Sequence, residues 1–232
     1  MICVLFDVDG TLVRTAGSGR RALDRAFESI YGIKRASDGV DFSGKPDLQN
    51  FGEVFEKNFG RKGKPLELKA AMAAYISFLP REVRRSVREG GYRLIPGVRE
   101  LLIELSRRDE VKVGLGTGNL EQGARIKLGP SRLNRFFSFG GYGSDHAERY
   151  RILQKAVRRA GRGVREVLVI GDTPRDIEAG RKAGYRTAVV TAGFSTAAEL
   201  KAAKPDHISR DFRPVERWLG WISQGNGGSH AS

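Results

Sequence analysis

The sequence predicts an α/β fold: a doubly wound parallel sheet with a Rossmann-like core and a small helical domain inserted after the first strand. Three observations support this prediction. Short, continuous apolar runs recur along the 232 residues, helical segments separate most of them, and residues 18–92 show helical patterns without a convincing strand. Strands that alternate with helices are typical of a sheet covered on both faces.

The predicted strands are apolar runs without in–out alternation, such as ICVLF at residues 2–6. Runs of this kind are typical of strands buried on both faces, as in a parallel sheet. They span residues 2–6, 111–115, 167–170 and 187–191, and a further strand is expected within residues 136–145, ending near Asp145. Helical segments precede three of these runs, at residues 98–108, 151–160 and 175–184. Trp218 and Trp221 are expected to anchor a last helix against the sheet.

The insert is predicted from apolar residues that recur at helical spacing. One face groups Leu23, Ala26, Phe27 and Ile30; a second groups Leu48, Phe51, Phe55 and Phe59. Residues 66–79 form a third strong helical stretch. We therefore expect a core of residues 1–15 and 93–222, a helical insert of residues 16–92, and a Gly- and Ser-rich disordered tail at residues 223–232.

The composition is that of an ordinary water-soluble domain, with 40% hydrophobic and 29% charged residues. No signal peptide or membrane span is expected, and the single cysteine, Cys3, excludes an intrachain disulfide, so a cytoplasmic location is predicted. The formal charge of +14 is attributed to solvated helix faces rather than to a nucleic-acid surface, because no aromatic stacking run accompanies it. No nucleic-acid or membrane partner is expected, and the protein is expected to be a monomer or homodimer.

Acidic residues follow two of the predicted strands. Asp7 and Asp9 follow the first, and Asp172 and Asp176 follow the strand at 167–170. Ligands bind beyond the carboxyl ends of parallel strands, and carboxylates that converge there need a cation. Because no histidine or cysteine accompanies them, the sequence favours Mg²⁺ as a cofactor.

Polar residues also follow the strand at 111–115, where GTGN places Thr117, Gly118 and Asn119. A threonine hydroxyl and backbone amides at a strand-to-helix turn favour a phosphate group. A carboxylate beside Mg²⁺ can attack phosphorus, and a second carboxylate two residues on can exchange a proton with the leaving group. The sequence thus predicts phosphoryl transfer.

The segments DVDGT, TGN and GDTPRD, in this order at strand ends, resemble three motifs of the haloacid dehalogenase superfamily. The helical insert resembles the C1 cap of its phosphoglycolate phosphatase-like branch. The resemblance implies that Asp7 is the nucleophile and Asp9 the general acid/base. It also implies that Mg²⁺ is held by Asp7, the Asp9 backbone carbonyl and Asp172, with Asp176 acting through water.

A fourth motif of the superfamily supplies a cation that steadies the nucleophile and phosphate, and its usual Lys-Pro pair is missing here. Two candidates remain: Lys127, in the helix after TGN, and Arg149, at the usual position. Lys127 is preferred, because branches of the superfamily place a lysine after this motif and a guanidinium is bulkier in a compact site. In the cap, the loop-like stretches at residues 17–23 and 43–47 are candidates to face the site. Within them Lys45 and, with less support, Arg20 are candidate substrate contacts.

The predicted function is therefore a Mg²⁺-dependent hydrolysis of a small, phosphoglycolate-like phosphate ester. Relatives that cleave carbon–halogen or carbon–phosphorus bonds generally lack a carboxylate at the position of Asp9, so this residue argues against both. A phosphomutase shares the two aspartates and stays open as an alternative. A basic, non-catalytic module that binds nucleic acid or protein is the remaining alternative, supported only by the charge.

Overall fold

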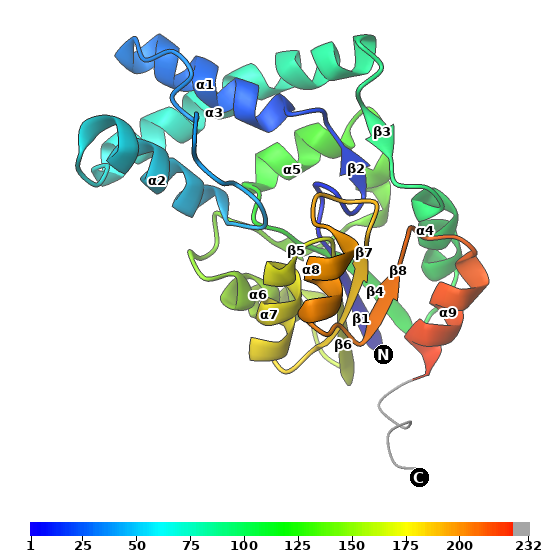
Figure 1. Ribbon diagram of the computed structural model, residues 1–232. Helices are drawn as coiled ribbons and strands as arrows, with labels where there is room; N and C mark the ends of the chain where they lie inside the picture. The colour runs from blue at the N-terminus through cyan, green and yellow to red at the C-terminus, as the bar shows by residue number, and fades with distance from the viewer. Residues whose placement is uncertain (225–232) are drawn as a thin grey trace.

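The computed structural model describes residues 1–224 and is built on one six-stranded parallel sheet with strand order β5-β4-β1-β6-β7-β8 (Figure 1). The central strand β1 pairs with β4 on one side and β6 on the other, so that Phe6 lies opposite both Leu115 and Ile170. The strands are β1 (Ile2–Phe6), β4 (Val111–Gly116), β5 (Gly140–Gly141), β6 (Glu166–Gly171), β7 (Arg186–Val190) and β8 (His207–Ser209). The parallel sheet predicted from the sequence is confirmed.

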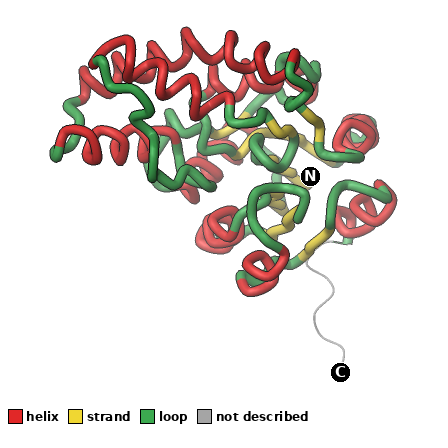
Figure 2. Tube along the Cα trace, turned by 45° about the horizontal axis from the view of Figure 1, so that its top comes forward, coloured by secondary structure: helices red, strands yellow, loops and turns green. Residues whose placement is uncertain are grey.

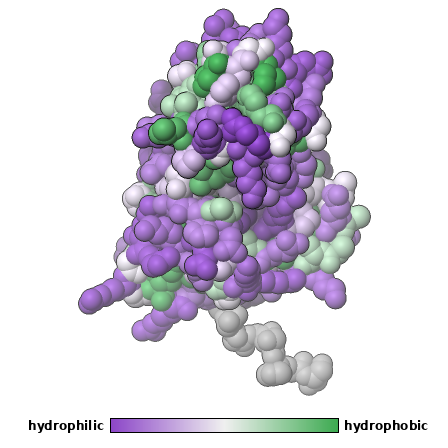
Figure 3. Space-filling model, turned by 90° about the vertical axis from the view of Figure 1, so that its left-hand side faces the viewer, coloured by the Kyte–Doolittle hydropathy of each residue, from purple (hydrophilic) through white to green (hydrophobic). Residues whose placement is uncertain are grey.

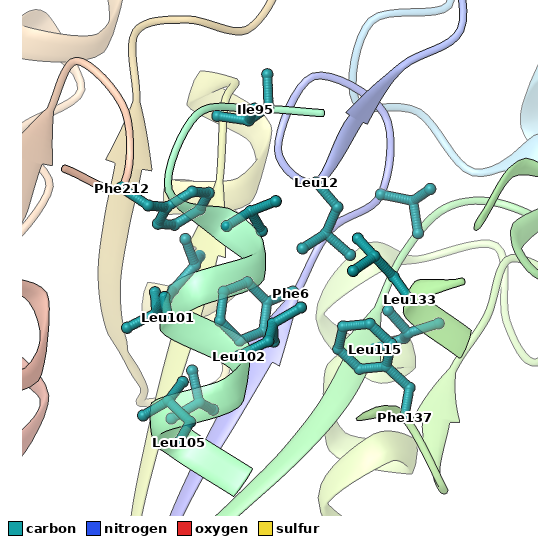
Figure 4. Close-up of a cluster of buried hydrophobic side chains, with 14 of the residues drawn as sticks. Phe6, Leu12, Ile95, Leu101, Leu102, Leu105, Leu115, Leu133, Phe137 and Phe212 are labelled. Carbon is teal, nitrogen blue, oxygen red and sulfur yellow. The ribbon is translucent and has the colours of Figure 1, made fainter. Parts of the chain in front are cut away.

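Side chains of β1 alternate between two apolar layers, because successive residues of a strand point to opposite faces. Val4 and Phe6 pack with residues of α4 and α9, whereas Cys3 and Leu5 pack with residues of α6. Figure 4 shows Phe6 between the leucines of α4 and the aromatic ring of Phe137. The helices of this part are α4 (Val98–Ser106), α5 (Glu121–Leu128), η1 (Leu133–Phe136), α6 (Arg149–Ala160), α7 (Pro174–Lys182), α8 (Ala197–Ala202) and α9 (Val215–Ser223).

The segment between β1 and α4 forms a separate helical layer above the sheet edge (Figures 1 and 2). Its helices are α1 (Ser18–Tyr31), α2 (Asp47–Phe59) and α3 (Pro65–Arg88), and they share their own apolar cluster around Phe27, Phe51 and Phe55. A two-stranded antiparallel ribbon joins this layer to the sheet, formed by β2 (Val13–Arg14) and β3 (Arg93–Leu94). We refer to residues 16–92 as the cap and to the remainder as the core.

Several details differ from the prediction. The strand expected within residues 136–145 shrinks to Gly140–Gly141, and β8 was not predicted. Ile30 and Phe59 are 40% and 36% exposed instead of lying inside their helix faces, whereas Trp218 and Trp221 are buried as expected. Ser223 is the last residue of α9, so the tail predicted from residue 223 begins too early; its residues 225–232 lie outside the described range.

The face turned to the viewer in Figure 3 is mainly hydrophilic, with small apolar groups separated from one another. Exposed arginines are frequent in the cap, for example along the carboxyl-terminal half of α3. Within residues 1–224, no helix combines the length and the apolar composition that crossing a membrane requires.

Candidate active site

Three neighbouring strands of the sheet end at one edge, and a polar residue follows each of them. Asp7 follows β1, Thr117 follows β4 and Asp172 follows β6. The strands are parallel and in register, so their ends meet, and the amide of Asp7 still donates a hydrogen bond to Ile170 (2.9 Å) in the next strand. The topology of the sheet therefore brings distant parts of the sequence to one site.

The chain turns sharply after Asp9, and Gly10 makes this turn possible. Its φ is +78°, a left-handed conformation that side chains disfavour. A Cβ atom at this position would also lie 2.1 Å from Oδ2 of Asp172. Glycine thus allows the backbone of the DVDGT segment to approach the carboxylate of the third strand end.

A buried acidic group lies beneath this turn. Carboxylate oxygens of Asp7, Asp172 and Asp176 all lie within 4.8 Å of one another. Burial raises the pKa of Asp7 to about 6, although the nearby Arg149 opposes this effect. Burial and the charges of Asp176 and Asp7 likewise raise the pKa of Asp172 well above its usual range. The raised values show that the charge of this group is only partly compensated by the protein.

Asp176 is held by the start of its own helix. Its Oδ2 accepts hydrogen bonds from the amide and hydroxyl of Thr173, which forms a capping box at the N-terminus of α7. Its Oδ1 lies 2.5 Å from Nη2 of Arg149. Asp176 therefore has a structural role in the helix start and also faces the acidic group.

Arg149, the first residue of α6, is the cation nearest the expected nucleophile. Its Nη2 lies 3.1 Å from Oδ1 of Asp7 as well as close to Asp176, and the residue is 8% exposed. Its Nη1 donates to the carbonyl of Gly44 in the cap (3.3 Å), and its Nε is buried without a hydrogen-bond partner within residues 1–224. The guanidinium thus connects the acidic group to the cap and keeps one donor free.

Lys127 reaches the other aspartate. Its Nζ lies 2.6 Å from Oδ2 of Asp9 and 2.5 Å from Oδ1 of Asn119. The Asn119 amide donates to Asp9 (2.9 Å) and to the hydroxyl of Thr117 (2.8 Å). Asp9, Lys127, Asn119 and Thr117 therefore form one hydrogen-bond network beside the acidic group.

A cavity of about 310 Å³ lies between the core and the cap, above both aspartates. Asp7, Asp9, Lys127 and Arg149 line its core side, and residues from α1, α2, α3 and the loop before α2 line its cap side. Thr117 is fully buried and does not line this cavity, whereas Asn119, which donates to its hydroxyl, does. Asp145, at the predicted end of another strand, pairs with Arg159 (2.6 Å) and stays outside the site.

The loop before α2 docks the cap on the core. The amide of Asp47 donates to the carbonyl of Gly118 (2.7 Å), and the carboxylate of Asp47 accepts from the amide of Leu120 (2.7 Å) at the start of α5. A Cβ atom on Gly118 would lie 2.6 Å from the carbonyl oxygen of Lys45. Gly118 is thus placed against the cap loop, and the sequence offered no sign of this contact.

The two cap cations predicted as substrate contacts line the cavity but are engaged elsewhere. Nζ of Lys45 lies 2.7 Å and 2.8 Å from the two carboxylate oxygens of Glu53. Arg20 donates to the backbone carbonyls of Ser37 (2.7 Å) and Val40 (2.8 Å). Both cap stretches that the sequence offered as facing the site, residues 17–23 and 43–47, contribute to the lining. Sequence reasoning missed the lining residues Asn50, Tyr75 and Phe194, for which the sequence carried no signal.

The comparisons with known proteins agree with this geometry. The model of the haloacid dehalogenase-like hydrolase family matches residues 4–190, so the chain belongs to this family of enzymes. A pyrophosphatase PpaX from Oceanobacillus iheyensis is 24% identical over 216 residues, which are 91% of this chain and 94% of the relative. A phosphoglycolate phosphatase from Synechococcus elongatus is 34% identical over 115 residues, which are 50% of this chain and 54% of the relative.

A solved structure confirms the fold. The structure of CbbY from Rhodobacter sphaeroides in complex with phosphate superposes with a TM-score of 0.71 at 21% identity. The match covers 92% of this chain and 95% of that chain, cap included. The arrangement of an α/β core with a helical insert is therefore shared with a solved structure.

Proposed function

We propose that this protein is a Mg²⁺-dependent phosphatase that hydrolyses a small organic phosphomonoester through an aspartyl-phosphate on Asp7. The main support is the position of Asp7 and Asp9 on one side of a 310 Å³ cavity, each beside its own buried cation. The relatives named pyrophosphatase and phosphoglycolate phosphatase agree with phosphate chemistry. We take phosphoglycolate as the guide to substrate size.

The residues at the sheet edge fit a magnesium ion. Three buried carboxylates lie within 4.8 Å of one another, without a histidine or cysteine, which is the oxygen donor set that Mg²⁺ prefers. Asp7, Asp172 and the backbone carbonyl of Asp9 would hold the ion, with Asp176 acting through water. When bound, the ion neutralises charge on the phosphoryl group during transfer.

The two aspartates then divide the chemistry. In the first half-reaction, a carboxylate oxygen of Asp7 bonds to phosphorus, the bond to the ester oxygen breaks, and Asp9 gives its proton to the departing alkoxide. In the second, Asp9 takes a proton from water, the water oxygen bonds to phosphorus, and the bond to Asp7 breaks. The products are the alcohol and inorganic phosphate, and both aspartates return to their initial states.

The contacts support different roles for the two cations. The guanidinium of Arg149 lies beside Asp7 and lines the cavity, so we assign it the role of steadying the nucleophile and phosphate. Lys127 lies beside Asp9 and Asn119, so we assign it the role of fixing the acid/base. The sequence preferred Lys127 for the first role, and the proposal reverses that preference.

The test is release of inorganic phosphate from a panel of small phosphate esters and pyrophosphate, with Mg²⁺ and with a chelator. The Asp7→Asn variant should lose at least roughly 10³-fold in kcat/KM, because an amide is a poor nucleophile. Asp145→Asn is the matched control, since Asp145 also follows a predicted strand but lies outside the cavity. Equal phosphate release from wild type and Asp7→Asn would overturn the proposal, and an isomeric phosphate without free phosphate would indicate a mutase.

A further inference from the structure

The cavity has four cationic residues in its lining, and the two on the cap side are already bonded to other groups of the cap. Lys127 and Arg149 belong to the core, and Lys45 and Arg20 belong to the cap. A substrate with a second anionic group would place this group on the cap side, because the phosphate occupies the core side. Whether the cap cations are free or bonded to other groups of the cap therefore determines which organic groups the cavity accepts.

Lys45 is neutralised by a residue behind the cavity wall. Both carboxylate oxygens of Glu53 lie within hydrogen-bond distance of its Nζ, at 2.7 Å and 2.8 Å. The side chain of Gln49 donates to the same carboxylate (2.9 Å) and fixes its orientation. The side chain of Lys45 is only 14% exposed, so this pair lies in a partly desolvated setting where it is held more tightly than a surface pair.

Arg20 is occupied in holding the cap loop together. Besides its bonds to the carbonyls of Ser37 and Val40, its guanidinium lies 4.4 Å from the centre of the Phe42 ring. These contacts use the face and the outer nitrogens of the guanidinium. Moving it toward a substrate would break two backbone hydrogen bonds and a cation–π contact.

The remaining cap-side lining is neutral or acidic. Leu23, Phe51 and Tyr75 supply apolar and phenolic surface, and Asp41 and Asp47 add carboxylates. Asn50 belongs to the same wall and has a buried Oδ1 without a hydrogen-bond partner among the described residues. A hydroxyl group of a substrate can donate to the carboxylates of Asp41 and Asp47, whereas an ionised carboxylate or phosphate cannot.

We propose that the cap side of the cavity selects an uncharged, hydroxyl-bearing organic group and disfavours a second anion, and that Glu53 enforces this choice by holding Lys45. Glu53 is a positioning residue, because it acts through Lys45 and does not line the cavity. The inference rests on the proposed phosphatase function and specifies its substrate class. It separates this protein from the substrates that the names of its relatives suggest, since phosphoglycolate and pyrophosphate both carry a second anionic group.

The test compares phosphoglycolate with 2-hydroxyethyl phosphate, which has the same chain length and carries a hydroxymethyl group in place of the carboxylate. Wild type should prefer the hydroxyl ester by at least roughly tenfold in kcat/KM, as expected for one uncompensated charge contact in a partly buried site. Glu53→Gln frees Lys45 and should reduce this preference by roughly tenfold, through a lower KM for phosphoglycolate. An unchanged preference in Glu53→Gln would overturn the role of Glu53.

Two further variants keep the test specific. Glu56→Gln makes the same charge change at an exposed position of the same helix and should leave the preference as in wild type. Adding Lys45→Met to Glu53→Gln should restore the wild-type preference, because the freed ammonium is then absent. A gain for phosphoglycolate that survives in the double variant, or that also occurs in Glu56→Gln, would contradict the proposed path through Lys45.

Binding separates this inference from the proposed function. Affinities of both esters for Asp7→Asn, in the presence of Mg²⁺, can be measured by calorimetry without turnover, with melting curves as a check on folding. A preference for the hydroxyl ester that Glu53→Gln removes supports the inference even when hydrolysis is not observed. Equal affinities, tighter binding of phosphoglycolate, or no binding of the hydroxyl ester would overturn it.

Discussion

The core side and the cap side of the cavity use buried charge in opposite ways. On the core side, Arg149 and Lys127 pair with aspartates that themselves line the cavity, so the pairs face the reacting group. On the cap side, Lys45 pairs with Glu53, which lies outside the cavity lining, so the pair faces away from it. The first arrangement keeps charge available for chemistry, and the second removes charge from the surface that contacts the organic group.

On the core side this arrangement destabilises two carboxylates at once. Burying the Asp7 and Asp172 carboxylates together destabilises their ionised forms, which is why the pKa values of both are raised. A fold tolerates such an arrangement where a ligand or ion compensates it, and perturbed titrations of this kind are typical of functional sites. In the cap, by contrast, the cation Lys45 is paired with the carboxylate of Glu53 inside the same layer.

The largest expected effect comes from removing a core cation. Arg149→Met leaves the buried carboxylates of Asp7 and Asp176 without their partner, and breaking a buried pair in this way costs about 3–5 kcal/mol. Lys127→Met should lower the free energy of unfolding by less, because the Asp9 side chain is 25% exposed and stays hydrated. Urea denaturation of both variants in a chelator measures the difference. A Lys127→Met variant less stable than Arg149→Met would contradict the contrast between the two cations.

The sequence could predict the core side of the site because topology alone brings its residues together. Asp7, Thr117 and Asp172 follow parallel strands, and parallel strands end at one edge of a sheet whatever the loops do. The same reasoning failed for Asp145, because the strand before it is reduced to two residues and its carboxylate turns to Arg159. Strand ends are thus informative only where the strand is long enough to fix the direction of the following turn.

The cap side could not be predicted, since its contacts depend on packing between helices. Nothing in the sequence indicated that Lys45 would pair with Glu53, eight residues away across a loop–helix boundary, and not with a substrate. The roles of Lys127 and Arg149 could not be assigned from the sequence for a related reason. Both side chains reach the site, and which aspartate each contacts depends on where α5 and α6 lie on the sheet.

A second test concerns Asp47, the residue that links the two sides. Burial and the charge of Asp9 raise its pKa to about 6, against the lowering effects of Lys127 and the Leu120 amide. Between pH 4 and 6 the unfolded chain releases this proton while the folded chain keeps it, so this residue makes stability fall as pH rises through that window. The asparagine of Asp47→Asn does not titrate, so the variant does not lose stability in this way. The difference between its free energy of unfolding and that of wild type should therefore rise by at most about 3 kcal/mol from pH 4 to pH 7.

The measurement is urea denaturation of both proteins at several pH values. Above about pH 7 the difference between wild type and Asp47→Asn should become constant, because the carboxyl is then ionised in both states. A difference that stays constant between pH 4 and 7, or one that falls, would show that Asp47 does not carry a raised pKa in the docked cap.

The smallest expected effect compares two glycines with the same backbone conformation. Gly10 in the core has φ +78° and Gly32 in the cap has φ +71°, so alanine brings similar backbone strain to both. A Cβ atom on Gly10 would meet Asp172 at 2.1 Å, whereas one on Gly32 would meet nothing within 4 Å. Gly10→Ala should therefore lower the free energy of unfolding by about 1–2 kcal/mol more than Gly32→Ala, as for an overpacked site. Equal losses of unfolding free energy in urea denaturation would contradict this expectation. They would mean that the Asp172 carboxylate moves aside without cost, and that the DVDGT turn does not hold this carboxylate in place.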